Sequence, residues 1–231
     1  MSVSPIAAMF DRISPKYDAL NHLLSLNIDK VWRRKTAKTV TKSHPNTLLD
    51  LATGTGDLAI ALAKCNPQTH IIGLDISEKM LDIGKTKIAQ RKLENQIELS
   101  LGNAATVPFE DNHFDAVTVA FGVRNFENLG KGISEIQRVL KPAGKVFILE
   151  FSMPERWPVK QLYRFYFNRI LPRIGRHLSK EPDAYTYLPE SVERFPKPDD
   201  FMQLLSEKGL ENCTKRTLSF GIATLYTAEK R

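Results

Sequence analysis

A carboxylate followed by two glycines is the first stretch of this chain that could do chemistry. Asp50 lies in the apolar run 48–52, and Gly54, Thr55 and Gly56 follow directly. Glycine lets the backbone turn sharply and still approach a ligand closely, because it has no Cβ atom. An apolar run that ends in such a turn predicts a buried strand leading into a helix, with a ligand bound at the turn.

The glycine spacing by itself favours a dinucleotide. Residues 54–59 fit the pattern G-x-G-x-x-G/A, and Asp75 follows at about the distance expected for a carboxylate that binds a ribose. A nicotinamide-dependent oxidoreductase is therefore one interpretation of this stretch. For Asp75 alone, capping of the next helix is the alternative.

Asp50 favours a different ligand, because an unpaired carboxylate is costly to bury in an apolar strand. A ligand with an ammonium and a sulfonium charge would neutralise it, directly or through water, whereas a pyrophosphate would be repelled. After a later strand, Asn103 offers an amide for a base edge, and Ala104 leaves room for a purine. These features predict S-adenosylmethionine as the cofactor, although Asn103 could also be an ordinary turn residue.

Strand-like and helix-like segments alternate across residues 46–151. We predict strands at 48–52, 70–75, 97–101, 114–120 and 145–151, and helices at 58–65, 79–91 and 133–140, with Ser77 capping the second helix. Strands joined by helices predict a parallel sheet that is covered on both faces. In such a sheet the ligand lies beyond the carboxyl ends of the strands.

The flanking segments complete a single predicted domain. Apolar residues recur at helical spacing over 9–32, as expected for a helical segment that packs on the core or covers the site. Near the C-terminus we predict a helix at 201–205 that stops before Gly209, then strands at 213–218 and 223–228. The predicted parts are an N-terminal helical lid (1–45), a cofactor-binding core (46–151), a substrate- and membrane-facing insertion (152–198) and a C-terminal helix with strands (199–231).

Composition excludes several classes of protein. The 231 residues are 42% hydrophobic and 26% charged, which is ordinary for a globular domain. No apolar run is long enough to span a bilayer, and Asp11, Arg12 and Lys16 interrupt any secretory signal, so we expect a cytoplasmic protein. Two distant cysteines predict neither a disulfide nor a metal site. The net charge of +7 favours an anionic partner.

A set of motifs extends over nearly the whole chain. Its members are Tyr17-Asp18 with Asn21 and Ser25, residues 49–57, residues 121–125, residues 138–142 with 149–151, residues 171–175 and residues 185–188. Together they resemble the ubiquinone/menaquinone biosynthesis C-methyltransferase family. The resemblance implies an α/β fold of the Rossmann-like S-adenosylmethionine-dependent methyltransferases, with a mostly parallel seven-stranded sheet, helices on both faces and an antiparallel C-terminal hairpin.

The resemblance also implies the cofactor site. The contacts predicted from it and from the turns above are Asp50, Gly54, Thr55, Gly56, Asp75, Ile76, Asn103, Ala104 and Ala120. Ala120 stands where some members have serine, so its contact is limited to the backbone. Two other positions depart from the family pattern, Asp29 in place of histidine and Ala143 in place of glycine.

The reaction implied by the family moves a methyl group from the sulfonium to a ring carbon of a prenylated quinol, converting demethylmenaquinol to menaquinol or acting on a ubiquinone precursor. The ring carbon becomes nucleophilic when the neighbouring hydroxyl loses its proton. We predict Arg124 as the catalytic residue, because a guanidinium can stabilise the phenolate or orient a water but does not act as a base. The alternative is a surface arginine paired to Glu127. Substrate contacts are predicted at Tyr17, Asn21, Arg124, Asn125, Tyr185 and Tyr187, and no metal is expected.

A basic segment with interleaved aromatic residues follows the core. Its cations are Arg156, Lys160, Arg164, Arg169, Arg173, Arg176 and Lys180. A solvated face, nucleic-acid binding and docking on anionic lipid are the competing interpretations. Because a prenylated substrate lies in the bilayer, we expect peripheral association with the inner face of an anionic membrane and no nucleic-acid partner. A homo-oligomer is compatible with the sequence, and a non-catalytic basic protein that binds RNA or a membrane is the third functional class.

Overall fold

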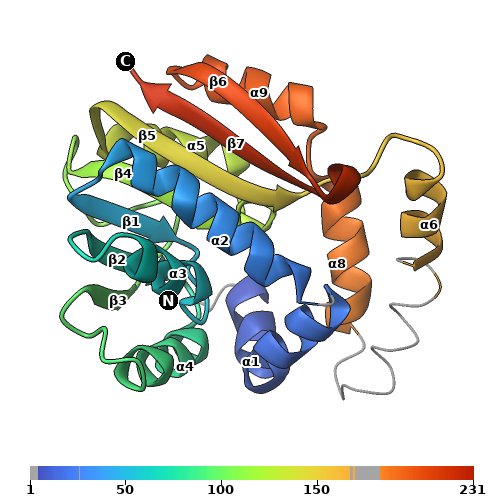
Figure 1. The fold of residues 1–231 in the computed structure, drawn as a ribbon, viewed down its shortest axis with the longest axis horizontal. Helices are drawn as coiled ribbons and strands as arrows, with labels where there is room; N and C mark the ends of the chain where they lie inside the picture. The colour runs from blue at the N-terminus through green and yellow to red at the C-terminus, as the bar shows by residue number, and fades with distance from the viewer. Residues whose placement is uncertain (1–4, 26, 167–168, 170–182) are drawn as a thin grey trace.

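The computed structural model describes the chain except for residues 1–4, 26, 167–168 and 170–182 (Figure 1). In the described part, seven strands form one sheet in the order β3-β2-β1-β4-β5-β7-β6. The strands are β1 (Thr47–Leu51), β2 (His70–Asp75), β3 (Ile97–Leu101), β4 (Phe114–Ala120), β5 (Leu140–Phe151), β6 (Leu210–Leu218) and β7 (Ala223–Lys230). Neighbours among β1 to β5 pair in parallel, and β7 is antiparallel to both β5 and β6. The predicted fold class, including the antiparallel C-terminal pair, is confirmed.

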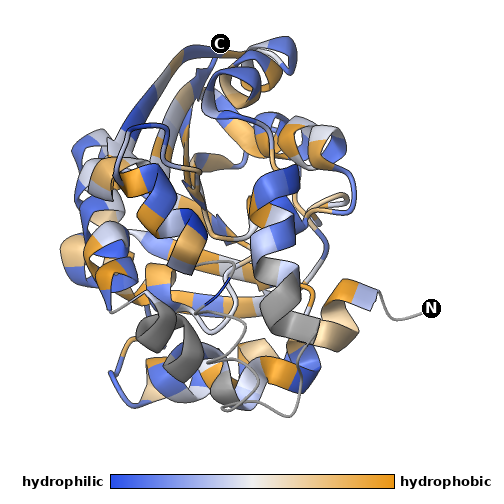
Figure 2. Cartoon of the chain, turned by 90° about the vertical axis from the view of Figure 1, so that its right-hand side faces the viewer, coloured by the Kyte–Doolittle hydropathy of each residue, from blue (hydrophilic) through white to orange (hydrophobic). Residues whose placement is uncertain are grey.

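Helices cover both faces of this sheet. They are α1 (Pro5–Leu24), α2 (Ile28–Val40), α3 (Asp57–Cys65), α4 (Glu78–Ala89), α5 (Leu129–Val139), α6 (Val159–Phe165), α8 (Asp183–Arg194) and α9 (Pro198–Glu207), with short 3-10 turns η1 (Thr41–Ser43), η2 (Val123–Asn125) and η4 (Ser219–Gly221). Orange and blue stretches alternate along the helices in Figure 2, as expected for helices with one apolar face.

Two apolar cores fill the space between the sheet and these helices. One joins the sheet to α5 and α9 through buried side chains such as Ile133 and Phe201. The other joins it to α2 and α3 through Trp32 and Leu58, among others. Because both faces are covered, the central strands can be apolar throughout, which is why their bounds are legible in the sequence.

The structure corrects several predicted boundaries. The N-terminal segment is two helices and not one, since Asn27 adopts a left-handed conformation (φ 60°) between α1 and α2. α5 begins four residues before the predicted start, because the Asn128 side chain accepts a hydrogen bond from the Lys131 amide and caps the helix. β5 begins at Leu140, five residues before the predicted start at 145.

Other predicted details are confirmed. The Ser77 side chain caps α4 by accepting from the Met80 amide. Gly209 follows α9 with a φ of 82°, the left-handed conformation that ends many helices. Among the described residues, no helix is both long and apolar enough to cross a membrane.

Candidate active site

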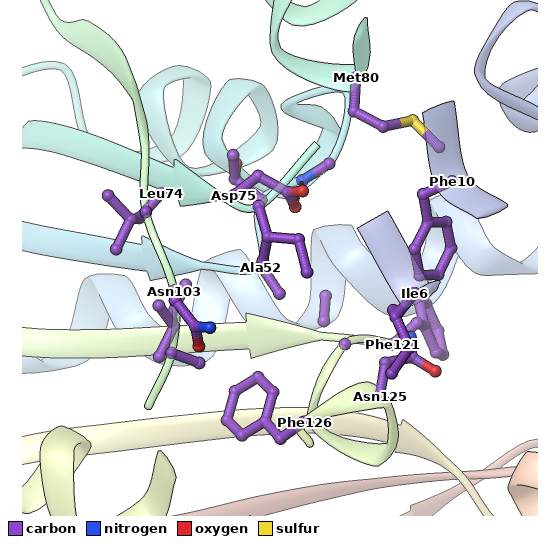
Figure 3. Close-up of a pocket in the computed structure, with 18 of the residues that line it drawn as sticks. Ile6, Phe10, Ala52, Leu74, Asp75, Met80, Asn103, Phe121, Asn125 and Phe126 are labelled. Carbon is purple, nitrogen blue, oxygen red and sulfur yellow. Dashed lines mark hydrogen bonds between the residues drawn. The ribbon is translucent and has the colours of Figure 1, made fainter. Parts of the chain in front are cut away.

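A cavity opens where the central parallel strands end, and α1 covers it. Its walls come from the turns after β1, β2, β3 and β4 and from three side chains of α1, which are Ile6, Phe10 and Tyr17. Figure 3 shows Asp75 and Asn103 on one side of this cavity and Phe10 and Ile6 on the opposite side. The position agrees with the prediction that a ligand binds beyond the carboxyl ends of the strands.

The glycine turn after β1 is held by Asp75. Gly54 has a φ of 58°, and a Cβ atom added there would meet nothing within 4 Å, so the turn faces open space. The Gly54 amide donates to Asp75 Oδ2 at 2.7 Å, and the Ser77 amide donates to Asp75 Oδ1 at 2.9 Å. Burial raises the pKa of the Asp75 carboxyl, although these backbone donors oppose the shift. Asp75 therefore lines the cavity and also joins two of its turns.

Asp50 has partners inside the protein, so its carboxylate does not depend on a ligand, and its predicted contact with the cofactor stays a prediction. Its carboxylate accepts from Thr53 Oγ1 at 2.7 Å and from Thr118 Oγ1 at 2.6 Å. The residue is 1% exposed and is not among the described residues that line the cavity. Two threonine hydroxyls can satisfy a buried carboxylate without any ligand. Desolvation nevertheless raises the pKa of Asp50 to about 6.

Thr55 connects the glycine turn to α1. It lines the cavity, and its hydroxyl donates to Asp18 Oδ1 of α1 at 2.6 Å. Lys87 of α4 donates to Thr55 Oγ1 at 3.0 Å and forms ion pairs with Asp18, at 2.9 Å, and Asp57. One ammonium thus bridges a helix over the cavity and the turn beneath it. A second link joins Asp11 of α1 to Ser77, whose hydroxyl donates at 2.6 Å.

The remaining predicted cofactor residues fall into two groups. Ile76, Asn103, Ala104 and Ala120 all line the cavity, together with Gly54. Asn103 Oδ1 accepts from the Ala105 amide at 2.8 Å, so the side chain shapes its turn as well as the wall. Gly56 is not among the described lining residues; it adopts a φ of 76° just before α3 and shapes the turn.

On the predicted substrate side, the structure brings three segments together. Tyr17 and Asn125 line the cavity, and the Tyr187 hydroxyl of α8 donates to Asn125 Oδ1 at 2.9 Å. Burial raises the pKa of Tyr187. The side chains of Asn21 and Tyr185 lie outside the described part of the structure, so their predicted contacts stay predictions.

Arg124 is buried, which excludes the surface alternative considered for it. Its side chain is 7% exposed, and Nη1 donates to Glu150 Oε1 at 2.7 Å and to the Phe121 carbonyl at 2.5 Å. Nε donates to Ser191 Oγ of α8 at 3.3 Å. Arg124 is not among the described lining residues, whereas its neighbour Asn125 is. The guanidinium therefore ties the ends of β4 and β5 to α8, directly behind the cavity wall.

Arg33 is a cavity residue that the sequence did not reveal. It lies on α2 and lines the cavity close to Phe121, with its guanidinium carbon 4.9 Å from the ring centroid. The positive charge of Arg33 lowers the pKa of Asp50, but burial has a larger effect and raises it. A single arginine in an amphipathic helix has no sequence pattern that would identify it as a site residue. Its position near the strand ends follows from the way α2 packs.

The fold and the cavity define a Rossmann-like methyltransferase architecture. A solved S-adenosyl-L-methionine-dependent methyltransferase from Methanococcus maripaludis superposes with a TM-score of 0.67 at 24% identity, covering 96% of this chain and 94% of that one. This likeness establishes the fold.

The sequence comparisons establish the family. The chain matches the model of the ubiE/COQ5 methyltransferase family over residues 2–230. It is 44% identical over 225 residues to the demethylmenaquinone methyltransferase of Bacteroides fragilis, covering 97% of this chain and 92% of that protein. It is also 44% identical to the ubiquinone/menaquinone biosynthesis C-methyltransferase UbiE of Geobacter sulfurreducens, covering 97% and 88% respectively. The chain belongs to the ubiE/COQ5 methyltransferase family. This confirms the predicted enzyme class and its S-adenosylmethionine cofactor, and the nicotinamide and non-catalytic alternatives have no support.

The residues present fit this cofactor. Asp75 offers a carboxylate at the cavity wall beside the glycine turn, as a ribose requires, and the open space at Gly54 lets a ligand approach the backbone. At the other end of the cavity, the Nε atom of Arg33 is buried and has no hydrogen-bond partner in the described part of the chain. A buried donor of this kind is costly unless something accepts from it.

The raised pKa of Asp50 predicts an unusual dependence of stability on pH. A carboxyl with a pKa near 3.9 when unfolded and about 6 when folded holds its proton longer in the folded state. Its contribution to the free energy of unfolding is therefore present below pH 4 and is lost as the pH rises through 6, by up to about 3 kcal/mol. The Asp50→Asn variant removes this loss, so its stability relative to the parent should increase between pH 4 and pH 6.

Urea unfolding of both proteins at several pH values measures this difference. Asp115→Asn is a control that should run parallel to the parent above pH 4, because hydrogen bonds from Lys141 and Thr47 outweigh desolvation and lower the pKa of Asp115, so that its pH dependence falls below pH 4. Parallel curves for Asp50→Asn and the parent across pH 4 to 7 would contradict the prediction.

Proposed function

We propose that this enzyme transfers a methyl group to a ring carbon of demethylmenaquinol and releases menaquinol. The observation that carries the proposal is a single cavity with two different sides. Polar groups of Asp75 and Asn103 lie on one side, and apolar side chains of α1, including Phe10 and Ile6, lie on the opposite side. A nucleoside-bearing donor and an apolar ring can therefore meet in one enclosure, and the names of the similar proteins in Bacteroides fragilis and Geobacter sulfurreducens supply the quinone class.

S-adenosylmethionine supplies an activated methyl group when it is bound. The protein contributes alignment and shielding of the acceptor ring. α1 covers the cavity with Ile6, Phe10 and Tyr17, which exclude water from the apolar side. Tyr187 fixes the amide of Asn125 at the wall, so that its nitrogen is available to a quinol oxygen.

Arg124 is proposed to favour the phenolate form of the acceptor. The hydrogen bonds found among the described residues use its Nη1 and Nε atoms, which leaves Nη2 for a phenolate oxygen or for a water that takes the proton. The side chain of Glu150 is 0% exposed and forms an ion pair with the Arg124 guanidinium. This pair holds the cation in a fixed orientation. A fixed donor beside a developing negative charge lowers the barrier without reorganisation.

We also propose that the enzyme docks on the inner face of an anionic membrane, where a prenylated quinol resides. Three large apolar side chains of the described part of the basic segment are exposed: Trp157 by 79%, Leu162 by 65% and Phe165 by 56%. They alternate with Arg156, Lys160 and Arg164, a combination typical of interfacial helices. Arg173, Arg176 and Lys180 lie outside the described residues. α6 lies at the opposite end of the molecule from β3 (Figure 1).

Methyl transfer to an authentic quinol tests the proposed reaction. With S-adenosylmethionine and reduced demethylmenaquinone, the purified enzyme should yield menaquinol, detected by mass spectrometry as a product heavier than the substrate by one CH2 group. Turnover should require the reduced ring, because only the quinol can form the electron-rich phenolate. A methoxylated prenyl benzoquinol serves as the competing substrate. Exclusive turnover of that compound, or none of either, would overturn the assignment.

For Arg124, substitution by lysine retains a cation for Glu150 but removes the planar guanidinium. We expect the kcat of Arg124→Lys to fall by about 10²-fold or more, while the affinity for S-adenosylhomocysteine changes little. Truncation to alanine is a weaker test, because it leaves Glu150 buried without its counter-ion and costs about 3–5 kcal/mol of stability. Unchanged kcat in Arg124→Lys would remove the guanidinium from the reaction.

Sedimentation with vesicles tests the membrane proposal. The protein should pellet with vesicles that contain anionic phospholipid at low salt, and less at high salt, because surface attraction is screened. The double variant Trp157→Ala/Phe165→Ala should lose most of this binding. Leu101→Ala removes a side chain that is 60% exposed on β3 and is the matched control, with binding expected to be unchanged. Equal pelleting with neutral vesicles would argue against an anionic docking surface.

A further inference from the structure

Arg33 is a buried cation that the mechanism above does not use. Its side chain is 12% exposed, and its Nε atom is buried without a hydrogen-bond partner among the described residues. Of the described residues that line the cavity, it is the one with a positive charge. A guanidinium carries five N–H donors, and burying them without acceptors is unfavourable.

The acids near Arg33 do not satisfy it. Asp29 Oδ2 lies 3.7 Å from Arg33 Nε, beyond the 2.7–2.9 Å typical of a charge-assisted hydrogen bond. The other oxygen of Asp29 already accepts from Ser25 Oγ at 2.6 Å. Asp50 accepts from its two threonines. Arg33 therefore keeps donors for an anionic group that enters the cavity.

The position of Arg33 identifies which part of a ligand it would meet. Asp75 and Asn103 follow β2 and β3 and suit the ribose and the base. Arg33 lies over the ring of Phe121, which follows β4, on the other side of β1. In S-adenosylmethionine the amino-acid group extends from the sulfur, away from the nucleoside, and ends in a carboxylate.

We propose that Arg33 binds the carboxylate of the amino-acid half of the methyl donor through its guanidinium. Arg33 on α2 is then the anionic anchor of the cofactor, and Asp75 at the far end holds the nucleoside. The inference rests on the methyl donor of the family and not on the identity of the quinol, so it stands or falls separately from the substrate assay.

Two ligands that differ only in this half of the molecule test the proposal. S-adenosylhomocysteine carries the amino-acid group, whereas 5′-methylthioadenosine has a methyl group in its place. Isothermal titration of Arg33→Met should show about 10- to 100-fold weaker binding of S-adenosylhomocysteine, equivalent to about 1.4–2.8 kcal/mol. The affinity for 5′-methylthioadenosine should stay within about twofold of the parent.

Arg34→Met is the matched control, because it removes the same charge from the next residue of α2, which is exposed. It should leave both affinities unchanged. Arg33→Lys keeps the charge but loses the planar fork, so it should weaken only S-adenosylhomocysteine and by less than Arg33→Met does.

Equal losses for both ligands in Arg33→Met, or no loss for either, would overturn the proposal and leave Arg33 as a counter-ion for Asp29 and Asp50. If Arg33→Met fails to fold because Asp29 is left buried without a cation, the double variant Asp29→Asn/Arg33→Met removes both charges. The same pair of ligands then gives the same two outcomes.

Discussion

The cavity depends on one partly buried carboxylate, that of Asp75. Its two oxygens accept from the amides of Gly54 and Ser77, so it fixes the turn after β1 and the start of α4 with respect to each other. Burial raises its pKa, and the two backbone donors oppose that shift. Asp50 lies close enough that the charge of Asp75 adds to the rise in its own pKa. The two carboxyl groups are therefore coupled, and of the two Asp75 is the one that lines the cavity.

The parallel core could be predicted closely from the sequence because its strands are short runs rich in apolar residues between helix-like segments. The predicted bounds 70–75, 97–101 and 114–120 agree with β2, β3 and β4. The predicted helix boundaries were wrong where a local hydrogen bond or a residue in the left-handed conformation sets the end of the helix. Asn128 starts α5 early through its side-chain cap, and Asn27 divides the N-terminal helices. Neither effect changes the hydrophobic period, so periodicity could not reveal it.

The structure brings the predicted residues at the strand ends together, whereas partners that lie far away in the chain could not be predicted. Thr55, Asp75 and Asn103 follow strands directly, so topology alone brings them to the cavity. The burial of Asp50 predicted that it has a partner, but Thr118 could not be predicted as that partner, because a neighbouring strand contributes it 68 residues later. Arg33 was not predicted for a related reason. No sequence pattern indicates that α2 packs with Arg33 facing the end of β4.

The aromatic pair at the ends of β4 and β5 explains how two buried arginines can flank one site. The rings of Phe121 and Phe151 lie 4.5 Å apart, and Trp32 contacts both. Arg33 lies over Phe121 at 4.9 Å and Arg124 over Phe151 at 5.4 Å, so each cation has its own ring.

Each arginine also has its own acid, but Glu150 binds Arg124 closely at 2.7 Å, whereas Asp29 stays 3.7 Å from Arg33. The tighter pair anchors α8, and the looser pair leaves its guanidinium open to the cavity. The two ion pairs therefore differ in role. Arg124 organises the side of the methyl acceptor, whereas Arg33 can bind the methyl donor.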